Sequence, residues 1–163
     1  MAHKIYIGID NGVSGSIGTI SDDGTYRYYP TPITTGQNYT KAKQNISRID
    51  YDELQKIFQS FLPECVFVAL ERPMVNPTRF KATVSAVRAL EATLIAIEQR
   101  CFPYMYIDSK EWQKALLPSG LEGPDLKKAS LDIGQRLFPN VDWTKLKDAD
   151  GLLIAEYARR KGF

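Results

Sequence analysis

Two apolar stretches that each end on an acidic residue constrain this sequence more than any other feature. The first predicted strand, at about Lys4–Asp10, stops on Asp10, and the run Val66–Leu70 is followed directly by Glu71. The second run is apolar at every position, which is typical of a central strand covered by helices on both faces. An acid at a strand end can be a metal ligand or part of a phosphate-binding turn, and the remaining sequence has to distinguish these roles.

The elements around these stretches predict a mixed α/β fold. Three strands joined by short turns come first, and the polar segment Pro30–Ser47 is expected to be a long functional loop. Strands and helices then alternate. The predicted strands are Lys4–Asp10, Ser16–Ser21, Thr25–Tyr29, Val66–Leu70 and Tyr104–Ile107, and the predicted helices are Asp50–Leu62, Thr78–Arg100, Ser109–Leu117, Asp125–Phe138 and Asp148–Arg160. This order is typical of a ribonuclease H-like fold, with a mixed five-stranded sheet and helices on both faces.

Length and composition narrow the classes of protein that fit. The 163 residues predict a single domain spanning residues 1–163, and a net charge of +2 permits an anionic partner without requiring one. A single histidine, His3, argues against a Cys/His zinc site. Because the sequence has no run of about 18 apolar residues and no signal-peptide pattern, we expect no membrane span and a cytoplasmic location.

The two strand-ending acids are expected to lie side by side. A right-handed β-α-β crossover makes their strands parallel neighbours, so Asp10 and Glu71 would meet about 5 Å apart at one sheet edge. Such a pair needs a proton or a cation between the two charges, and oxygen ligands suit Mg²⁺ or Mn²⁺. Asp148 and Asp150, at the start of the last predicted helix, would add enough oxygens for two ions. Each acid alone has a structural alternative, and Asp148 could simply cap its helix.

Three segments of the sequence resemble the RuvC Holliday-junction resolvases, and most closely the RuvC-like endonucleases of phages. These segments are 7–12 (Ile-Gly-Ile-Asp-Asn-Gly), 68–73 (Val-Ala-Leu-Glu-Arg-Pro) and 147–155 (Lys-Asp-Ala-Asp-Gly-Leu-Leu-Ile-Ala). Their order along the chain also matches the family. The resemblance implies a dimeric, Mg²⁺-dependent nuclease that cuts four-way junctions and other branched DNA with two symmetric nicks.

The resemblance also implies a set of metal ligands. Asp10, Glu71 and Asp150 match the family's ligands for two Mg²⁺ ions, which Mn²⁺ could replace. The family usually carries an Asp or His three residues before the last Asp, but this position is Lys147 here. Asp148 could complete the site if it lies at an unwound helix start, and Lys147 could instead contact the phosphate.

Further residues are expected to contact DNA. By resemblance, Lys127 would approach the scissile phosphate. The apolar side chain of Met74 would be a wedge at the junction centre, with packing on its own loop as the alternative. Lysines along two predicted helices are candidates for backbone contacts, with a solvated surface as the alternative reading. These lysines are Lys110, Lys114, Lys127 and Lys128. The long helix Thr78–Arg100 corresponds to the family's dimer helix, and the expected dimer rests mainly on this resemblance, because an apolar stripe is more often simply core.

Three other functions fit parts of the sequence. The Asp-x-Gly turn between two strands also occurs in actin-like and sugar-kinase ATPases, but those proteins need a second domain and a second glycine-rich turn. A non-catalytic binder of branched DNA would be expected to lose acids that are retained here. A related nuclease acting on RNA-containing substrates remains open, because the matched acids do not distinguish DNA from RNA.

Overall fold

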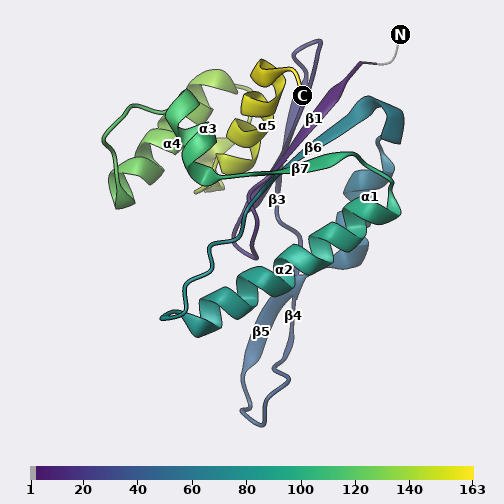
Figure 1. Cartoon of the computed structure of the whole chain (residues 1–163), viewed down its shortest axis with the longest axis vertical. Coiled ribbons are helices and arrows are strands. Elements are labelled where there is room, and N and C mark those ends of the chain that lie inside the picture. Colours follow the sequence, from purple (N-terminus) through teal and green to yellow (C-terminus); the bar gives the residue numbers. More distant parts are fainter. Residues whose placement is uncertain (1–2) are drawn as a thin grey trace.

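The computed structural model describes residues 3–163 and contains a mixed five-stranded sheet with the strand order β3-β2-β1-β6-β7 (Figure 1). Strands β1 to β3 form an antiparallel meander, while β6 and β7 run parallel to β1. The strands are β1 (Ile5–Ile9), β2 (Ser16–Ser21), β3 (Tyr26–Pro30), β6 (Val66–Glu71) and β7 (Tyr104–Ile107). This arrangement confirms the predicted ribonuclease H-like sheet.

Helices cover both faces of the sheet, as the apolar sequence of β6 predicts. Val68 and Leu70 of β6 pack in one core with α1 and α2, while Ala69 faces a second core with α3, α4 and α5. The helices are α1 (Tyr51–Gln59), α2 (Phe80–Gln99), α3 (Ser109–Leu116), α4 (Gly123–Leu137) and α5 (Asp150–Lys161), with short 3₁₀ turns at Pro63–Cys65 and Trp143–Lys145. The Asp50 side chain accepts a hydrogen bond from the Glu53 N–H at 3.1 Å and so caps the start of α1.

Helix α5 lies directly on the backbone of β1 and β2 because glycines face it. A Cβ atom at Gly8 would stand 2.2 Å from the Ala155 nitrogen and 2.2 Å from the Gly151 carbonyl oxygen. A Cβ atom at Gly18 would similarly stand 2.4 Å from the backbone of Leu152. This close approach brings the first residue of α5, Asp150, over the end of β1, where Asp10 follows.

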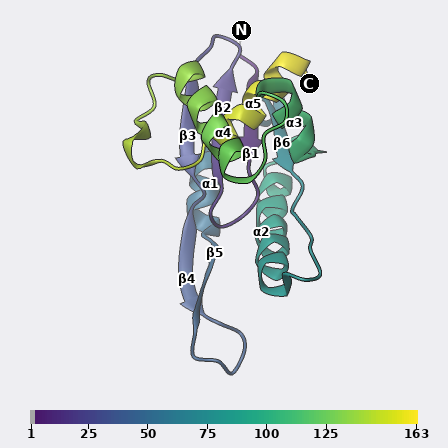
Figure 2. The same cartoon turned by 90° about the vertical axis from the view of Figure 1, so that its left-hand side faces the viewer.

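The segment predicted as a long loop forms a β-hairpin instead. Strands β4 (Ile33–Gln37) and β5 (Asn45–Ile49) pair antiparallel and form their own two-stranded sheet. The hairpin projects away from the main sheet and runs beside α2 (Figures 1 and 2). Most of its side chains are exposed on both faces, so the segment lacks the alternation of apolar and polar residues that identifies a strand in sequence.

The longest helix, α2, starts two residues later than predicted and carries apolar side chains on its outer face. Phe80 is 69% exposed, and Val87 and Ile95 are 44% and 42% exposed. The buried residues of the same helix, among them Ala89 and Ala96, face the sheet. No helix within residues 3–163, α2 included, has the length and apolar character needed to cross a membrane.

Candidate metal centre

Asp10 and Glu71 follow paired residues of neighbouring strands. Strands β1 and β6 run parallel with Ile9 opposite Leu70, so the next residue of each strand is an acid at the same sheet edge. The predicted adjacency of Asp10 and Glu71 is therefore present in the structure. The Asp10 backbone N–H donates to the Ser16 carbonyl at 3.0 Å, which holds the residue against β2 as its strand ends.

The two late acids reach the same edge from the start of α5. The Asp150 N–H donates to Oδ1 of Asp148 at 2.8 Å, so Asp148 lies in the segment before the helix and folds back over its first turn. Carboxylate oxygens of Asp10, Asp148 and Asp150 all lie within 4.8 Å of one another. The helix starts at Asp150 and not at Asp148 as predicted, and this shorter helix lets the two acids converge although they are only two positions apart.

This convergence raises the pKa of two of the carboxyl groups. Burial raises the pKa of Asp10 well above its usual range, and hydrogen bonding with Glu71 and the charges of Asp148, Glu71 and Asp150 raise it further. Burial, followed by the charge of Asp148, raises the pKa of Asp150 to about 7, against the opposing effect of a hydrogen bond from Ser130. Acids placed so closely favour either a bound proton or a cation.

Side chains that the sequence analysis did not assign hold the acids in place. The Trp112 indole N–H donates to Oε1 of Glu71 at 2.9 Å, and the Ser130 hydroxyl hydrogen-bonds to Oδ1 of Asp150. Trp112 is 1% exposed and comes from α3, while Ser130 comes from α4. The Ser16 hydroxyl accepts from the Gly151 N–H at 3.0 Å, which fixes the start of α5 on β2. Helical periodicity could place Trp112 in the core, but it could not reveal the acid that Trp112 contacts.

The donor set fits a divalent cation that prefers oxygen ligands. Oδ2 of Asp148 is buried and has no hydrogen-bond partner within residues 3–163. An acceptor oxygen in this state costs free energy unless a proton or a cation satisfies it. The trio of Asp10, Asp148 and Asp150 offers carboxylate oxygens only, a combination that suits Mg²⁺ or Mn²⁺ better than Zn²⁺. Glu71, held by Trp112 next to Asp10, is a fourth carboxylate at the same edge.

The predicted DNA-contacting lysines differ in how they lie relative to these acids. Lys127 is exposed on α4, one helical turn before Ser130, and Lys147 is exposed beside Asp148. Lys128 is exposed one position further along α4. Lys110 and Lys114 are also exposed, but they lie on the side of α3 opposite Trp112 and so point away from Glu71.

Met74 lies in the loop between β6 and α2, three residues after Glu71, and is 77% exposed. An apolar side chain this accessible, in the loop that follows Glu71, is free to contact another molecule. The neighbouring Val75 is 63% exposed, so the loop presents two consecutive apolar side chains.

Comparison with solved structures places the chain among proteins with the RuvC fold. RuvC of Thermus thermophilus in complex with a Holliday junction substrate aligns with a TM-score of 0.63 and 16% identity, covering 98% of this chain and 97% of that one. A second Thermus thermophilus RuvC structure aligns with a TM-score of 0.56 and 18% identity, over 97% and 96% of the two chains. The yeast mitochondrial Holliday junction resolvase Ydc2 aligns with a TM-score of 0.48 and 15% identity, covering 92% of this chain and 75% of that one.

The RuvC-like fold predicted from the sequence is thus confirmed, in particular the mixed sheet with helices on both faces. No protein-family model matches the sequence, and no curated protein is similar enough in sequence to match it. At these levels of identity the likeness concerns the fold, and the chemistry has to be argued from the residues of the site.

Proposed function

We propose that this protein is a Mg²⁺-dependent endonuclease that cuts four-way junctions and other branched DNA. The observation that carries this proposal is the convergence of Asp10, Asp148 and Asp150 within 4.8 Å at the sheet edge of a RuvC-like fold. A RuvC with this fold is known in complex with a Holliday junction substrate, which supports the choice of substrate class.

The residues of the site have separable roles in phosphodiester hydrolysis. We assign Asp10, Glu71, Asp148 and Asp150 as ligands of two Mg²⁺ ions, which would activate the attacking water and stabilise the departing oxygen. Trp112 and Ser130 act as positioning residues, because their hydrogen bonds to Glu71 and Asp150 limit the rotation of these carboxylates. Lys127, one turn from Ser130, would balance negative charge that develops on the scissile phosphate.

The carboxyl groups must lose their protons before they can bind a cation. Asp150, whose pKa is raised to about 7, is partly protonated at neutral pH when no cation is present. A bound Mg²⁺ ion and a bound proton therefore compete for the same oxygens, so we expect activity to rise with pH through this range.

We further propose that the protein acts as a homodimer through α2. The outer face of this helix carries Phe80, Val84, Val87 and Ile95 at helical spacing, and three of these four side chains are substantially exposed. An exposed apolar stripe on one helix can pair with its own copy about a two-fold axis, since two-fold interfaces use the same patch on both subunits. Two subunits related in this way would cut two strands symmetrically.

Met74 is proposed as an apolar wedge at the branch point. Its exposed side chain follows Glu71 by three residues, so a base step that it opens would lie close to the acids. Apolar side chains inserted between base pairs unstack them and kink the helix.

A cleavage panel tests the proposed function. The protein is incubated with Mg²⁺ and end-labelled four-way, three-way, flap and linear duplex DNA of matched sequence. We expect cleavage of the branched substrates, with paired and symmetric nicks in the four-way junction, and little cleavage of the linear duplex. An equal rate on linear and branched DNA, or no cleavage of any branched substrate, would contradict the proposal. Glu71→Gln is the matched inactive control.

A further inference from the structure

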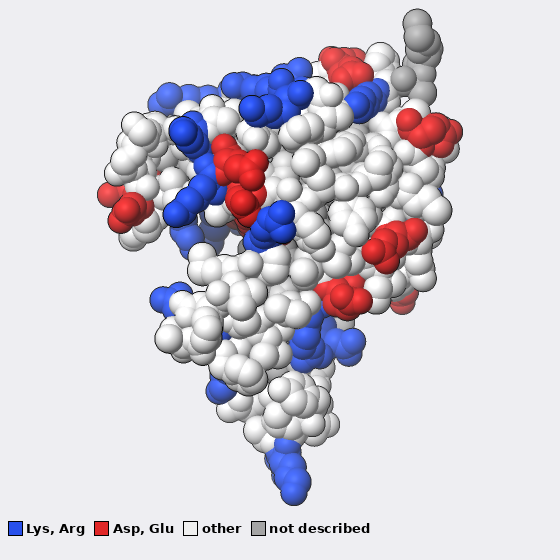
Figure 3. Space-filling view, viewed as in Figure 1, with Lys and Arg blue, Asp and Glu red and all other residues white. Residues whose placement is uncertain are grey.

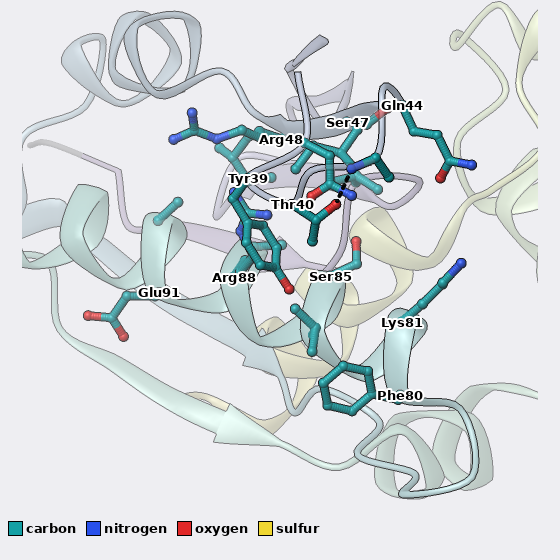
Figure 4. A pocket seen from close by; sticks show the side chains of 18 of the residues that line it. Tyr39, Thr40, Gln44, Ser47, Arg48, Phe80, Lys81, Ser85, Arg88 and Glu91 are labelled. Atoms are coloured by element: carbon teal, nitrogen blue, oxygen red, sulfur yellow. Dashed lines mark hydrogen bonds between the residues drawn. The ribbon is translucent and has the colours of Figure 1, made fainter. Parts of the chain in front are cut away.

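The β4–β5 hairpin and helix α2 enclose a groove of about 830 Å³ (Figure 4). Apolar side chains from both walls make up much of its lining. Phe80, Val84 and Ile95 line it from α2, and Ile46 and Ile49 line it from the hairpin. Figure 3 shows that uncharged side chains cover much of the lower part of the molecule, where these two elements lie. Such a groove is suited to a partner with an apolar surface of its own.

The α2 wall of the groove belongs to the surface that the proposed dimer uses. Phe80, Val84 and Ile95 are part of the apolar stripe of this helix. Tyr39 on the hairpin wall is 73% exposed, so a partner lying along the stripe would cover its ring as well. The groove is thus continuous with the proposed two-fold interface, and this continuity favours a second copy of the chain as its occupant.

Two oppositely charged side chains stand in the middle of the apolar stripe. Arg88 and Glu91 both line the groove and share one face of α2, because they are three positions apart. Within residues 3–163 neither of them forms an ion pair. The Arg88 guanidinium lies 5.7 Å from the centre of the Tyr39 ring, so the hairpin limits where this side chain can point (Figure 4). A partner that covers both charges has to present the opposite charges to them.

We propose that the groove binds α2 of a second copy in an antiparallel arrangement, in which Arg88 of each subunit faces the partner's Glu91. The proposal rests on the proposed homodimer and adds the register of the two helices and the contribution of the hairpin. In this register the two-fold axis passes between positions 89 and 90. Val84 then faces the partner's Ile95, and Val87 faces the partner's Ala92, so apolar side chains meet apolar ones.

Other arrangements of the two helices match the charges less well. In a parallel pair each residue would face its own copy, so Arg88 would meet the partner's Arg88. Sliding the antiparallel pair by about one helical turn in one direction would set Val84 against the partner's Glu91, and sliding it the other way would bring the two Glu91 side chains together. Like charges that face each other oppose association, so the charge pattern favours the proposed register.

The same groove reaches the segment next to the candidate metal centre. Val13, three positions after Asp10, is among its lining residues. The Asn11 side chain donates to the Ala86 carbonyl at 3.2 Å, which ties this loop to α2. A partner helix in the groove would therefore lie beside the loop that follows the first predicted metal ligand, and dimerisation would bury part of that loop.

Charge reversal tests the register without metal or DNA. In Arg88→Glu both contacts of the dimer become pairs of acids, and in Glu91→Arg both become pairs of bases. We expect each variant to weaken dimerisation at least about 100-fold in analytical ultracentrifugation, since like charges would meet twice in every dimer. An equimolar mixture of the two variants should form a heterodimer with nearly the parent affinity, because the acids of one subunit then face the bases of the other. Lys145→Glu, at an exposed position of the second 3₁₀ turn, is the control and should stay dimeric.

Cross-linking provides a second measurement that leaves these charges in place. In a background that carries Cys65→Ser and Cys101→Ser, we expect Val84→Cys/Ile95→Cys to form disulfide-linked dimers on mild oxidation, because the two positions face each other across the axis. Val84→Cys alone should give no such dimer. Two copies of this position would lie roughly 16 Å apart along the helices, which is too far for a disulfide.

Several outcomes would overturn this register. Single charge-reversal variants that stay dimeric would do so, as would a mixture that stays monomeric although each variant unfolds in urea at the parent's midpoint. Absence of disulfide-linked dimers in Val84→Cys/Ile95→Cys would overturn it as well. Weaker DNA binding by Arg88→Glu with no change in oligomeric state would assign the groove to nucleic acid instead.

The proposed function and this inference can fail separately. A parent protein that is monomeric at all concentrations refutes the homodimer and, with it, the register. Cleavage of branched DNA by a dimer that shows no rescue on mixing refutes only the register. A heterodimer that forms on mixing, from a parent protein that cuts no branched DNA, refutes only the nuclease.

Discussion

Asp10 and Asp150 are held in the folded protein under conditions that favour their protonated forms. Burial contributes most to the rise in pKa of both groups, and neighbouring carboxylates add to it. A fold that concentrates acids in this way is less stable without a cation than it would be with neutral side chains at these positions. The residues of the site are therefore arranged for ligand binding at the expense of the stability of the metal-free chain.

This electrostatic arrangement predicts how stability depends on pH. The folded state holds a proton on Asp150 up to about pH 7, whereas the unfolded state releases it near 3.8, so stability falls as pH rises through this window. In EDTA, we expect the free energy of unfolding to drop by about 2 kcal/mol between pH 5.5 and 8.5, measured by urea denaturation. Asp150→Asn should flatten this dependence. A parent protein that gains stability over the same range would contradict the assignment.

A second prediction distinguishes the role of Asp148 in binding the metal from the role of Lys147 in binding DNA. Because Oδ2 of Asp148 is buried without a hydrogen-bond partner within the described residues, we expect Asp148→Asn to weaken Mn²⁺ binding at least about 10-fold in calorimetry. Lys147→Ala should leave Mn²⁺ affinity nearly unchanged and instead lower the salt slope of duplex binding by about 0.9. The opposite pattern would mean that Asp148 is a helix cap and that Lys147 tunes the metal site.

The sequence predicts the place of some residues in the candidate metal site better than that of others. The adjacency of Asp10 and Glu71 follows from strand order alone, because parallel neighbours end at the same edge. The contacts of Trp112 and Ser130 with the acids depend on how α3 and α4 dock on the sheet, which no local pattern specifies. The convergence of Asp148 with Asp150 likewise depends on a helix that starts two residues later than its pattern indicates.

At the scale of elements, the docking of α5 on β1 and β2 determines where the site forms. Gly8, Gly18 and Gly151 allow the helix backbone to touch the strands, and the Ser16 hydroxyl holds its first turn. The position of Asp150 over Asp10 thus depends on these glycines, whose lack of a side chain lets α5 approach the sheet. Substitutions at these glycines are expected to act on the metal site from a distance.

Gly8→Ala tests this link. Its Cβ atom would stand 2.2 Å from backbone atoms of Gly151 and Ala155, so α5 must move away from the sheet. We expect a loss of about 3 kcal/mol in urea denaturation, the upper end for an overpacked core, together with weaker Mn²⁺ binding. Gly36→Ala, where a Cβ atom meets nothing within 4 Å, should change stability by less than about 0.5 kcal/mol. Equal effects of the two substitutions would refute the role assigned to the close packing.

The order of elements in the main sheet was predictable, whereas the β4–β5 hairpin was not. Strands of the sheet are buried and apolar, so their pattern is strong even without an alignment. The hairpin is a two-stranded ribbon with Thr34, Thr35 and Gln37 exposed, so that polar side chains lie on both faces, and such a segment resembles a loop in composition. Its position beside α2 emerges only from the three-dimensional fold.

At the scale of the whole molecule, paired cleavage of two DNA strands requires two active sites held at a fixed distance and orientation. The exposed apolar stripe of α2 is the surface proposed to supply this relation, and it lies on the side of the helix away from the buried Ala89 and Ala96.

Val87→Glu tests the dimer. Placing a charge in the centre of the stripe should shift the protein from dimer to monomer in multi-angle light scattering, with little loss of monomer stability because Val87 is 44% exposed. On a cruciform plasmid, the variant should give nicked circles where the parent gives linear product. Leu62→Glu, at an apolar position after α1 that is 60% exposed, is the control. A Val87→Glu protein that stays dimeric would show that this face of α2 is not the dimer interface.

The most direct test of the account is single-turnover cleavage of a four-way junction by the parent protein, Asp10→Asn and Asp150→Asn. With Mg²⁺, we expect the parent to cut and each variant to be slower by on the order of 1,000-fold, about 4 kcal/mol in activation free energy. In EDTA, all three proteins should bind the junction with similar affinity. Cleavage by both variants at the parent rate, or junction binding that depends on these carboxylates in EDTA, would contradict the claim that they form a metal-dependent DNA-cleavage site.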